Sequence, residues 1–493
     1  MGVIKRQTIK GSIYSYIGLI IGFFFTVIST KLFTPEQIGL TAILVAVSAL
    51  YSQFATLGFT KVIERLFPYF RDKDKNHNGF LFLTIAVATI GITISVITFL
   101  LLKPRIIENN LEKSPLLVKY IWYLVPLIFF RTFFLMLDTY NKMLFDATTG
   151  SILSDFVFRL GTLFLIGAFF LNWISFPQFV LGFVVFLSFP AVYLAGLLIY
   201  RKQFSLNPKP GFIKPALRKE ITSLSFFGMI IGFSSIALKN IDTIMMNSYT
   251  NLSMTGVYNI SFYFGTVILI PAIALGKISS TIIAEAWKNK DMETIDDIYF
   301  KSSINQLFAA LLLFILMVTN LHNIFKILGP EYIDGQWVIV LISLSNLIVA
   351  STGVSVQIIG TSHKYKIQTY SMGVLLGLVI IFYMIFIPIW GMTGAALGSL
   401  LSVAGASLFR VFYLHRNMKL FPYRIVHLKC VAIGLLAFVV GKIIPVLPFH
   451  FLVDLVVRSF AISAVFIGLC YMFNISDDLN QIADKLLKYF RIS

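Results

Sequence analysis

Charged residues interrupt several long apolar stretches of this sequence. A charge inside a membrane-length apolar segment is costly and usually has a partner or a function. Three groups have the spacing of neighbours on a helix: Lys61, Glu64 and Arg65; Asp155 and Arg159; Lys239 and Asp242. A fourth group, Arg131 and Asp138, lies seven residues apart on one helix face. Two interpretations stay open for each group. Its members neutralise one another and hold helices together, or its cations face a water-filled cavity.

Lys277 differs from these groups because no acid lies three or four residues from it on either side. Its ammonium therefore faces water, an acid on another helix or an anionic ligand, unless it snorkels to the membrane surface. Surplus positive charge suits a phosphate, which arginine binds through two donors and lysine as a point charge. The candidate substrate-binding cations are Lys277, Arg131, Arg159, Lys61, Arg65 and Lys239, and the candidate coupling or pairing acids are Asp242, Asp138, Asp155 and Glu64.

The composition is that of a polytopic membrane protein. Of 493 residues, 58% are hydrophobic and 13% are charged, whereas a soluble domain has about 25% charged residues. The net charge of +18 fits basic loops that orient membrane helices rather than nucleic-acid binding. The two cysteines form no zinc spacing or disulfide framework. We expect no catalytic residue, no metal site and no cofactor, with H⁺ or Na⁺ as the candidate coupling ion.

Apolar windows of about 20 residues predict about 14 spanning helices. Basic residues gather in alternate connections, which predicts that both termini are cytoplasmic. Residues 476–492 are predicted to form an amphipathic helix on the membrane surface, capped by Ser476. The expected spans are 11–30, 39–66, 78–102, 118–141, 150–172, 176–200, 220–246, 254–286, 302–321, 336–358, 367–388, 391–414, 426–447 and 451–473.

An internal repeat predicts two lobes. The nine residues from Ser15 share six identities with the nine from Ser225, and both copies run through a polar break to a glycine, Gly39 or Gly256. Six helices per copy make the copies parallel, and such folds hold the substrate between the halves. The expected parts are an N-lobe (1–200), a basic cytoplasmic linker (201–219), a C-lobe (220–417), two extra helices (418–475) and the surface helix (476–493).

Four stretches carry a resemblance to a known family: residues 31–39 (KLFTPEQIG), 240–246 (NIDTIMM), 256–261 (GVYNIS) and 327–332 (ILGPEY). In order and spacing the chain resembles bacterial polysaccharide and O-antigen repeat-unit flippases of the multidrug/oligosaccharidyl-lipid/polysaccharide exporter superfamily, with the lipid II flippase as a cousin. The resemblance implies two six-helix lobes around a cavity and alternating access.

The same resemblance implies a function in surface polysaccharide biosynthesis. Members carry undecaprenyl-(pyro)phosphate-linked oligosaccharide units from the cytoplasmic to the periplasmic leaflet of the bacterial inner membrane. The implied partners are this anionic lipid-linked oligosaccharide, membrane lipids and other polysaccharide assembly proteins. The last two helices resemble those of branches in which an added pair forms a groove for the lipid tail.

Two alternatives belong to other classes. A cation-coupled multidrug exporter of the same superfamily would need an acid in the first lobe to carry H⁺ or Na⁺, but residues 11–30 contain none and the charges within the spans are mostly positive. A membrane polymerase or ligase would need acid–base groups on a sizeable outside loop. The longest expected outside loops, 103–117 and 322–335, lack such a set. We therefore expect a transporter and not an enzyme.

Overall fold

The computed structural model describes residues 24–72, 74–212, 214–364, 366–446 and 450–481, together with positions 22, 448 and 484. At positions 210, 274, 277 and 278 it describes the backbone only. The helices are α2 (Pro35–Ala55), α3 (Phe59–Phe70), α4 (Phe80–Asn110), α5 (Pro115–Tyr120), α6 (Leu124–Met143), α7 (Thr149–Ser151), η3 (Ile152–Val157), α8 (Phe158–Phe170), α9 (Phe176–Tyr200), α10 (Pro215–Tyr249), α11 (Leu252–Thr266), α12 (Ile270–Asn289), α13 (Met292–Thr319), α14 (Leu321–Leu328), α15 (Gln336–Ser351), α16 (Ser355–Thr361), α17 (Lys366–Met418), α18 (Ile425–Ile443) and α19 (Phe451–Met472), with short 3₁₀ turns between some of them.

The predicted all-α membrane fold is confirmed. The described residues form helices without any strand, and twelve helical segments among them are long and apolar enough to cross a membrane. Most of the expected first span, 11–30, lies outside these residues, although Phe24 to Leu32 are helical. The predicted surface helix begins as expected, since Ser476 Oγ accepts from the Leu479 backbone N–H at 3.5 Å. Its later part, from 485 onward, also lies outside the described residues.

One helical segment contains two of the expected spans. The 53-residue run α17 is interrupted at Gly391, whose φ of 54° and ψ of −128° are not helical. The helical parts before and after Gly391 pack against each other, and Tyr383 Oη of the first lies 2.5 Å from Ser399 Oγ of the second. The expected spans 367–388 and 391–414 therefore form a helical hairpin.

Two other expected spans are broken. The single span predicted at 39–66 is two helices, because Leu57 and Gly58 both have positive φ values of 49° and 69° and end α2. The span predicted at 254–286 bends at a 3₁₀ turn, Val267–Leu269, just before Pro271 in α12. Hydropathy alone misses both interruptions because the residues around them stay apolar.

The polar breaks before the two repeat glycines are helix caps. Thr34 and Gln37 form a capping box at the start of α2, with each side chain bonded to the other residue's backbone N–H. Asn251 caps α11 in the same place, since its Oδ1 accepts from the Met254 N–H at 2.9 Å. Each glycine follows its cap residue by five positions. Caps satisfy backbone donors that the first helical turn leaves unpaired.

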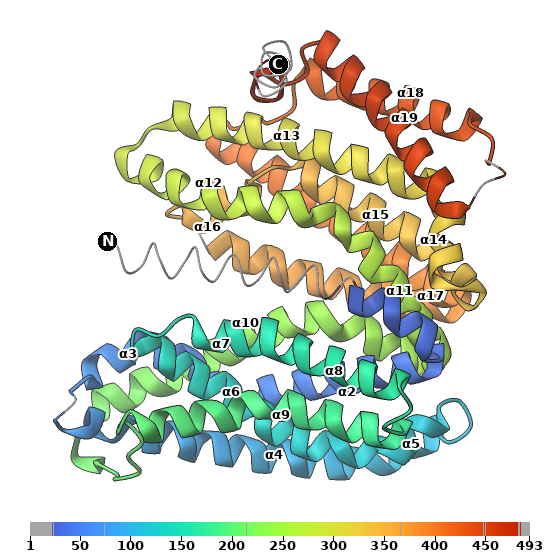
Figure 1. Ribbon diagram of the computed structural model, residues 1–493. Coiled ribbons are helices and arrows are strands. Elements are labelled where there is room, and N and C mark those ends of the chain that lie inside the picture. Colours follow the sequence, from blue (N-terminus) through green and yellow to red (C-terminus); the bar gives the residue numbers. More distant parts are fainter. Residues whose placement is uncertain are drawn as a thin grey trace. The chain divides into compact units, whose positions relative to one another are not determined.

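The chain divides into two compact units, Met1–Gly256 and Val257–Ser493. In unit 1, α6 packs against α9, α2, α3 and α4, while α8 covers α9 (Figure 1). Helix α10 also belongs to unit 1 and packs against α2 and α3. The sequence repeat would place this helix in the second lobe. The lobe boundary at 201–219 stays a prediction, because repetition and compact packing are different properties.

Glycines bring α10 and the start of α11 close to the rest of unit 1. A Cβ on Gly228 of α10 would lie 2.6 Å from the Gly58 carbonyl oxygen. A Cβ on Gly256 would lie 1.9 Å from the Pro35 carbonyl oxygen, and one on Gly39 would lie 2.0 Å from that of Leu252. Gly39 and Gly256, which occupy equivalent positions in the sequence repeat, thus allow the backbones of α2 and α11 to touch.

Unit 2 is built on α13, which packs against α15, α12 and α18. The last two helices, α18 and α19, pair with each other and bury Cys430 and Cys470 against α13. Within α19, Asp454 and Arg458 form an ion pair at 3.0 Å, with side chains 1% and 4% exposed. Asp454 also accepts hydrogen bonds from Asn323 and contacts His322 Nε2 at 2.9 Å, both on α14. These groups satisfy a pair of charges that burial would otherwise make costly.

Candidate functional site

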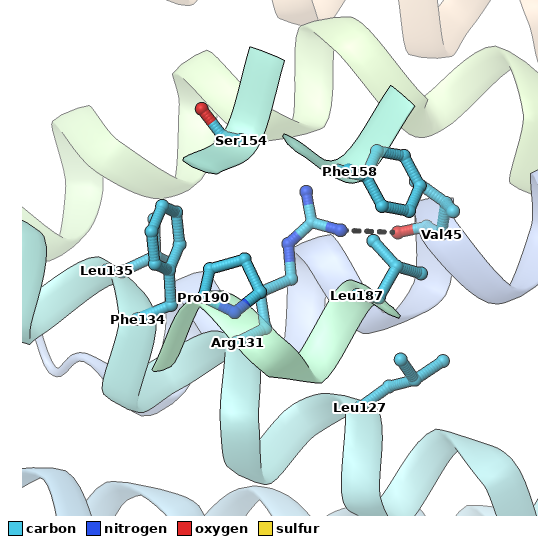
Figure 2. Close-up of a pocket in the computed structure, with 9 residues that line it drawn as sticks. All are labelled: Val45, Leu127, Arg131, Phe134, Leu135, Ser154, Phe158, Leu187 and Pro190. Carbon is cyan, nitrogen blue, oxygen red and sulfur yellow. Dashed lines mark hydrogen bonds between the residues drawn. The ribbon is translucent and has the colours of Figure 1, made fainter. Parts of the chain in front are cut away.

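Arg131 lies in a pocket of about 240 Å³ within unit 1. Its guanidinium reaches into the pocket from α6, between Ser154 of η3, Phe158 of α8 and Leu187 and Pro190 of α9 (Figure 2). The fourth wall is α2, where the Val45 carbonyl oxygen accepts a hydrogen bond from Arg131 Nη1 at 3.4 Å. Most other lining groups are apolar, so Arg131 provides the charge in this pocket.

Arg131 makes no ion pair within the described part of the chain. A guanidinium has five N–H donors, and the bond to Val45 uses one of them. A cation of a spanning helix that has free donors and faces a pocket is suited to bind an anionic group. This pocket is therefore a candidate site for an anionic ligand.

The helix opposite Arg131 is locally irregular. Residues Ile152–Val157 form a π-helical turn between α7 and α8, and this turn carries Ser154 and Asp155. Single π turns inside α-helices are uncommon and frequent at functional sites. The turn places Ser154 on the wall of the Arg131 pocket. Sequence reasoning singled out Asp155 here but missed Ser154 and the π turn.

The predicted pair of Arg131 and Asp138 does not form. Asp138 instead binds Lys142, one turn farther along α6, with 2.5 Å between Oδ2 and Nζ. Residues four apart on a helix are neighbours, whereas seven residues separate two groups by about 10 Å along the axis. Asp138 Oδ1 is buried and has no hydrogen-bond partner among the described residues. It packs against Gly150, where a Cβ would lie 1.7 Å away.

The charged group on α3, formed by Lys61, Glu64 and Arg65, is exposed. Lys61 and Glu64 pair at 2.6 Å as predicted, with side chains 46% and 45% exposed. Arg65 lies 3.9 Å from Glu220 of α10 and is more exposed still. Exposed pairs of this kind contribute little to stability. They do not line the Arg131 pocket.

The group on α10 also departs from prediction. Asp242 is buried, with its carboxylate accepting from the Thr243 backbone N–H at 2.7 Å, whereas Lys239 is exposed. No ion pair joins them among the described side chains. Although the two residues are only three positions apart on α10, Asp242 points into the packed interior of unit 1 and Lys239 points to its surface. Asp155 and Arg159 are both partly buried in unit 1, and their mutual pairing stays a prediction.

Lys277 belongs to α12 in unit 2, but its side chain lies outside the described residues. All the other predicted site residues belong to unit 1. A role of Lys277 in binding therefore stays a prediction. No cluster of metal-binding side chains occurs among the residues that the structure describes.

A polar cluster that sequence reasoning missed closes one end of α6. Asp146, in the connection to α7, binds Arg201 Nη2 at 2.9 Å and the Thr149 hydroxyl at 2.8 Å. Asn141 contributes its side chain to both Arg201 and the Asp146 carbonyl. Burial raises the pKa of Asp146, but the bonds from Thr149 and Arg201 outweigh it and hold the pKa below its usual value. Fifty-five residues separate the two charges, so no local spacing reveals the pair.

The amino-acid sequence matches the model of a family described as polysaccharide biosynthesis protein over residues 4–283, more than half of the chain. The chain belongs to the polysaccharide biosynthesis protein family. This confirms the resemblance that the sequence motifs suggested. No curated protein is similar enough in sequence to count as a relative.

Solved structures share the fold of this family member. The lipid II flippase MurJ in an inward closed conformation is 15% identical with a TM-score of 0.74, over 95% of this chain and 100% of that chain. An inward-facing multidrug resistance MATE family transporter is 13% identical with a TM-score of 0.60, over 81% of this chain and 94% of the other. A MOP superfamily transporter from Pyrococcus furiosus is 11% identical with a TM-score of 0.53, over 84% and 96%. At these identities the likeness establishes the fold alone.

Proposed function

We propose that this protein is a flippase. It carries an undecaprenyl-(pyro)phosphate-linked oligosaccharide unit from the cytoplasmic to the periplasmic leaflet of the bacterial inner membrane, for surface polysaccharide biosynthesis. Its membership of the polysaccharide biosynthesis protein family supports this proposal. So does the fold that it shares with a lipid II flippase. Transport proceeds by alternating access, and other polysaccharide assembly proteins supply and consume the unit.

Arg131 carries the proposal at the residue level. It is a cation in a spanning helix, faces a pocket and has no acidic partner among the described side chains. The phosphate of a lipid-linked sugar supplies the missing negative charge and accepts two of the free guanidinium donors. Lys277 and Arg159 remain further candidate contacts to the same anion.

The test compares surface polysaccharide in cells whose own copy of the gene is deleted. Arg131→Met should abolish surface polysaccharide and accumulate the lipid-linked unit on the inner leaflet, while Arg131→Lys retains part of the export. Arg218→Met is the matched control, because Arg218 is exposed and outside the pocket. Normal export by Arg131→Met, at a normal protein level, would contradict the proposed phosphate contact.

Lys277 requires a separate test. Lys277→Ala should reduce export if its ammonium also contacts the anion, whereas a lysine that snorkels to the surface leaves export unchanged. Protein level and thermal stability measured in the same cells and extracts separate loss of transport from loss of folding.

Asp138 is the leading candidate for the acid that couples transport to an ion gradient. Its Oδ1 is buried and receives no hydrogen bond from the described residues, so this atom is a candidate to take up H⁺ or to contact Na⁺. Asp138→Asn should slow transport in proteoliposomes driven by a pH or sodium gradient, without changing binding of the lipid-linked unit. Unchanged gradient dependence would remove Asp138 from the coupling step.

The multidrug exporter is the second candidate, and the shared MATE-like fold favours it. The two functions make opposite demands on the pocket, since a cationic drug is repelled by Arg131 and an anionic lipid is attracted. Deletion of the gene should leave drug sensitivity unchanged and reduce surface polysaccharide. Increased sensitivity to cationic drugs with normal polysaccharide would favour the exporter.

A further inference from the structure

A second cavity of unit 1 is a groove of about 520 Å³ bounded by α4, α6 and α9. Every lining residue is apolar or glycine, including Phe129 and Phe133 of α6 and Ala195 and Gly196 of α9. Several of these side chains are exposed, with Val192 at 55% and Ile199 at 61%. These helices are long and apolar enough to span a membrane, so their exposed apolar side chains suit contact with the hydrocarbon of the bilayer. The groove is separate from the Arg131 pocket, with which it shares no lining residue.

The length of the groove matches one leaflet. Its lining residues on α6 run from Phe129 to Leu137, and those on α9 run from Ala191 to Ile199. Eight residues of α-helix span about 12 Å, and half of the hydrocarbon core is about 15 Å thick. A hydrocarbon chain lying along α6 and α9 therefore fills the groove within one leaflet.

The chain folds back over one end of the groove. α9 ends at Tyr200, Lys202 takes a positive φ of 55°, and the Gln203 N–H bonds to the Leu198 carbonyl oxygen. This turn returns Phe204 and Leu206 to the groove wall. The Tyr200 side chain is 87% exposed, as expected for an aromatic residue at the membrane–water interface.

The charges at this end leave a net positive group. Lys142 is paired with Asp138 and Arg201 with Asp146. Lys202 is exposed and forms no ion pair with any described residue. Arg71, which donates to the Met143 carbonyl oxygen at the end of α6, likewise forms no ion pair with any described residue. Uncompensated positive charge at the polar end of an apolar groove is complementary to a phosphate attached to a hydrocarbon chain.

We propose that this groove binds one molecule of an anionic membrane phospholipid, with an acyl chain along α6 and α9 and its phosphate at Lys202. The site is independent of the transported substrate, so its failure and the failure of the proposed function are separate results. The bound lipid covers the apolar groove and restrains the turn that joins α9 to the following connection.

Gly196 and Gly167 supply a matched pair of variants for the test. Both are exposed helical glycines, and a Cβ on either would have no atom within 4 Å. Gly196→Trp fills the groove, whereas Gly167→Trp adds the same side chain to α8, away from it. The full-length protein, delipidated in detergent, is titrated with dioleoylphosphatidylglycerol or dioleoylphosphatidylcholine, and native mass spectrometry counts the bound lipids.

We expect the wild type and Gly167→Trp to bind one phosphatidylglycerol more tightly than phosphatidylcholine, and Gly196→Trp to lose this site at least tenfold in affinity. Lys202→Ala leaves the groove intact and should weaken phosphatidylglycerol binding about fivefold without changing phosphatidylcholine binding. This variant keeps the test decisive if Gly196→Trp does not fold.

Three results would overturn the proposal. The first is equal lipid binding by Gly196→Trp and Gly167→Trp. The second is an equal affinity of the wild type for the two phospholipids. The third is a polyprenyl phosphate that binds more tightly than phosphatidylglycerol and is displaced by Gly196→Trp, because the groove would then hold an isoprenoid chain instead of an acyl chain.

Discussion

At the scale of single residues, charge in the N-terminal unit is arranged by helix spacing and by distant contacts. Asp138 pairs with Lys142 four residues on, which leaves Arg131 for the Val45 carbonyl and the pocket. A cation of a spanning helix that no acid neutralises is expensive to keep. Arg131 is therefore the residue at which a ligand has most to contribute.

The absence of a side chain at Gly150 leaves the space that the Asp138 carboxylate occupies. A Cβ there would lie 1.7 Å from Asp138 Oδ1, so Gly150→Ala must move the carboxylate away from its present position. We expect a loss of about 1–3 kcal/mol of stability, which is the usual cost of overpacking, measured as a lower thermal unfolding temperature in detergent. Gly167→Ala is the control, because no atom lies within 4 Å of its Cβ. Equal stability of the two variants would show that Asp138 adapts freely.

Asp146 predicts an acid-dependent loss of stability. Its pKa lies below the usual value because the bonds from Thr149 and Arg201 outweigh burial. A carboxylate with a depressed folded-state pKa stabilises the protein above its unfolded pKa, about 3.9, and loses that contribution as the pH falls through the folded pKa. Asp146→Asn should cost about 1 kcal/mol at pH 7, since Arg201 is 37% exposed and solvent screens the pair.

The measurement for Asp146 is the unfolding temperature of wild type and Asp146→Asn across a pH series. The difference should be largest at pH 7 and should shrink below about pH 4. A difference that stays constant down to pH 3 would mean that the side-chain shape, and not its charge, stabilises this connection.

At the scale of elements, two kinds of glycine interrupt the apolar segments for different reasons. Gly391 has no atom within 4 Å of its Cβ position, yet its φ of 54° and ψ of −128° are those that other residues avoid. Gly391→Ala should therefore destabilise the α17 hairpin through backbone strain of about 1–3 kcal/mol. The check is the unfolding temperature beside that of Gly377→Ala, a helical glycine with equally open surroundings. Similar values for the two variants would contradict the strain.

Most elements could be predicted from the sequence because long apolar windows have few alternatives in a membrane. The span predicted at 176–200 coincides with α9, and that at 426–447 overlaps α18 closely. The interruptions at Gly58 and Gly391 could not be predicted, since a positive φ inside an apolar run leaves no mark on hydropathy. The caps at Thr34 and Asn251 were visible as polar breaks but not as caps.

The site was predicted in part. Arg131 followed from its charge alone, and Lys61 and Glu64 pair as their spacing indicates. The walls of the pocket come from α2, α6, η3, α8 and α9. Which faces of these apolar helices meet is decided by tertiary packing that periodicity does not encode. For the same reason the Asp146–Arg201 pair and the partner of Arg65 were not found.

At the scale of the whole molecule, α10 packs as part of unit 1, although it begins the second copy of the sequence repeat. Its Gly228 lies against Gly58, and its Asn247 donates to Asn110 at 2.9 Å. We therefore expect coexpressed fragments 1–208 and 209–493 to copurify through a tag on either one. Adding Gly58→Leu to the first fragment should abolish copurification, because a side chain there meets the Ser225 carbonyl at 2.1 Å.

The control for this experiment is Gly167→Leu in the same fragment, which places the added side chain where no atom lies within 4 Å. Copurification that survives Gly58→Leu would show that other contacts hold the fragments together.

The contacts of α10 also order events during synthesis. Unit 1 cannot be completed when the ribosome has finished α9 at Tyr200, because the backbone atoms that pack against Gly58 and Gly39 belong to residues 225 to 256. At about 5–20 residues per second, that covering segment follows several seconds later. During this interval the glycine-lined faces of α2 and α3 are open to lipid, to the insertion machinery or to a neighbouring chain. We expect nascent chains stalled near residue 214 to be cleaved by added protease more readily than chains stalled once α11 has left the ribosome.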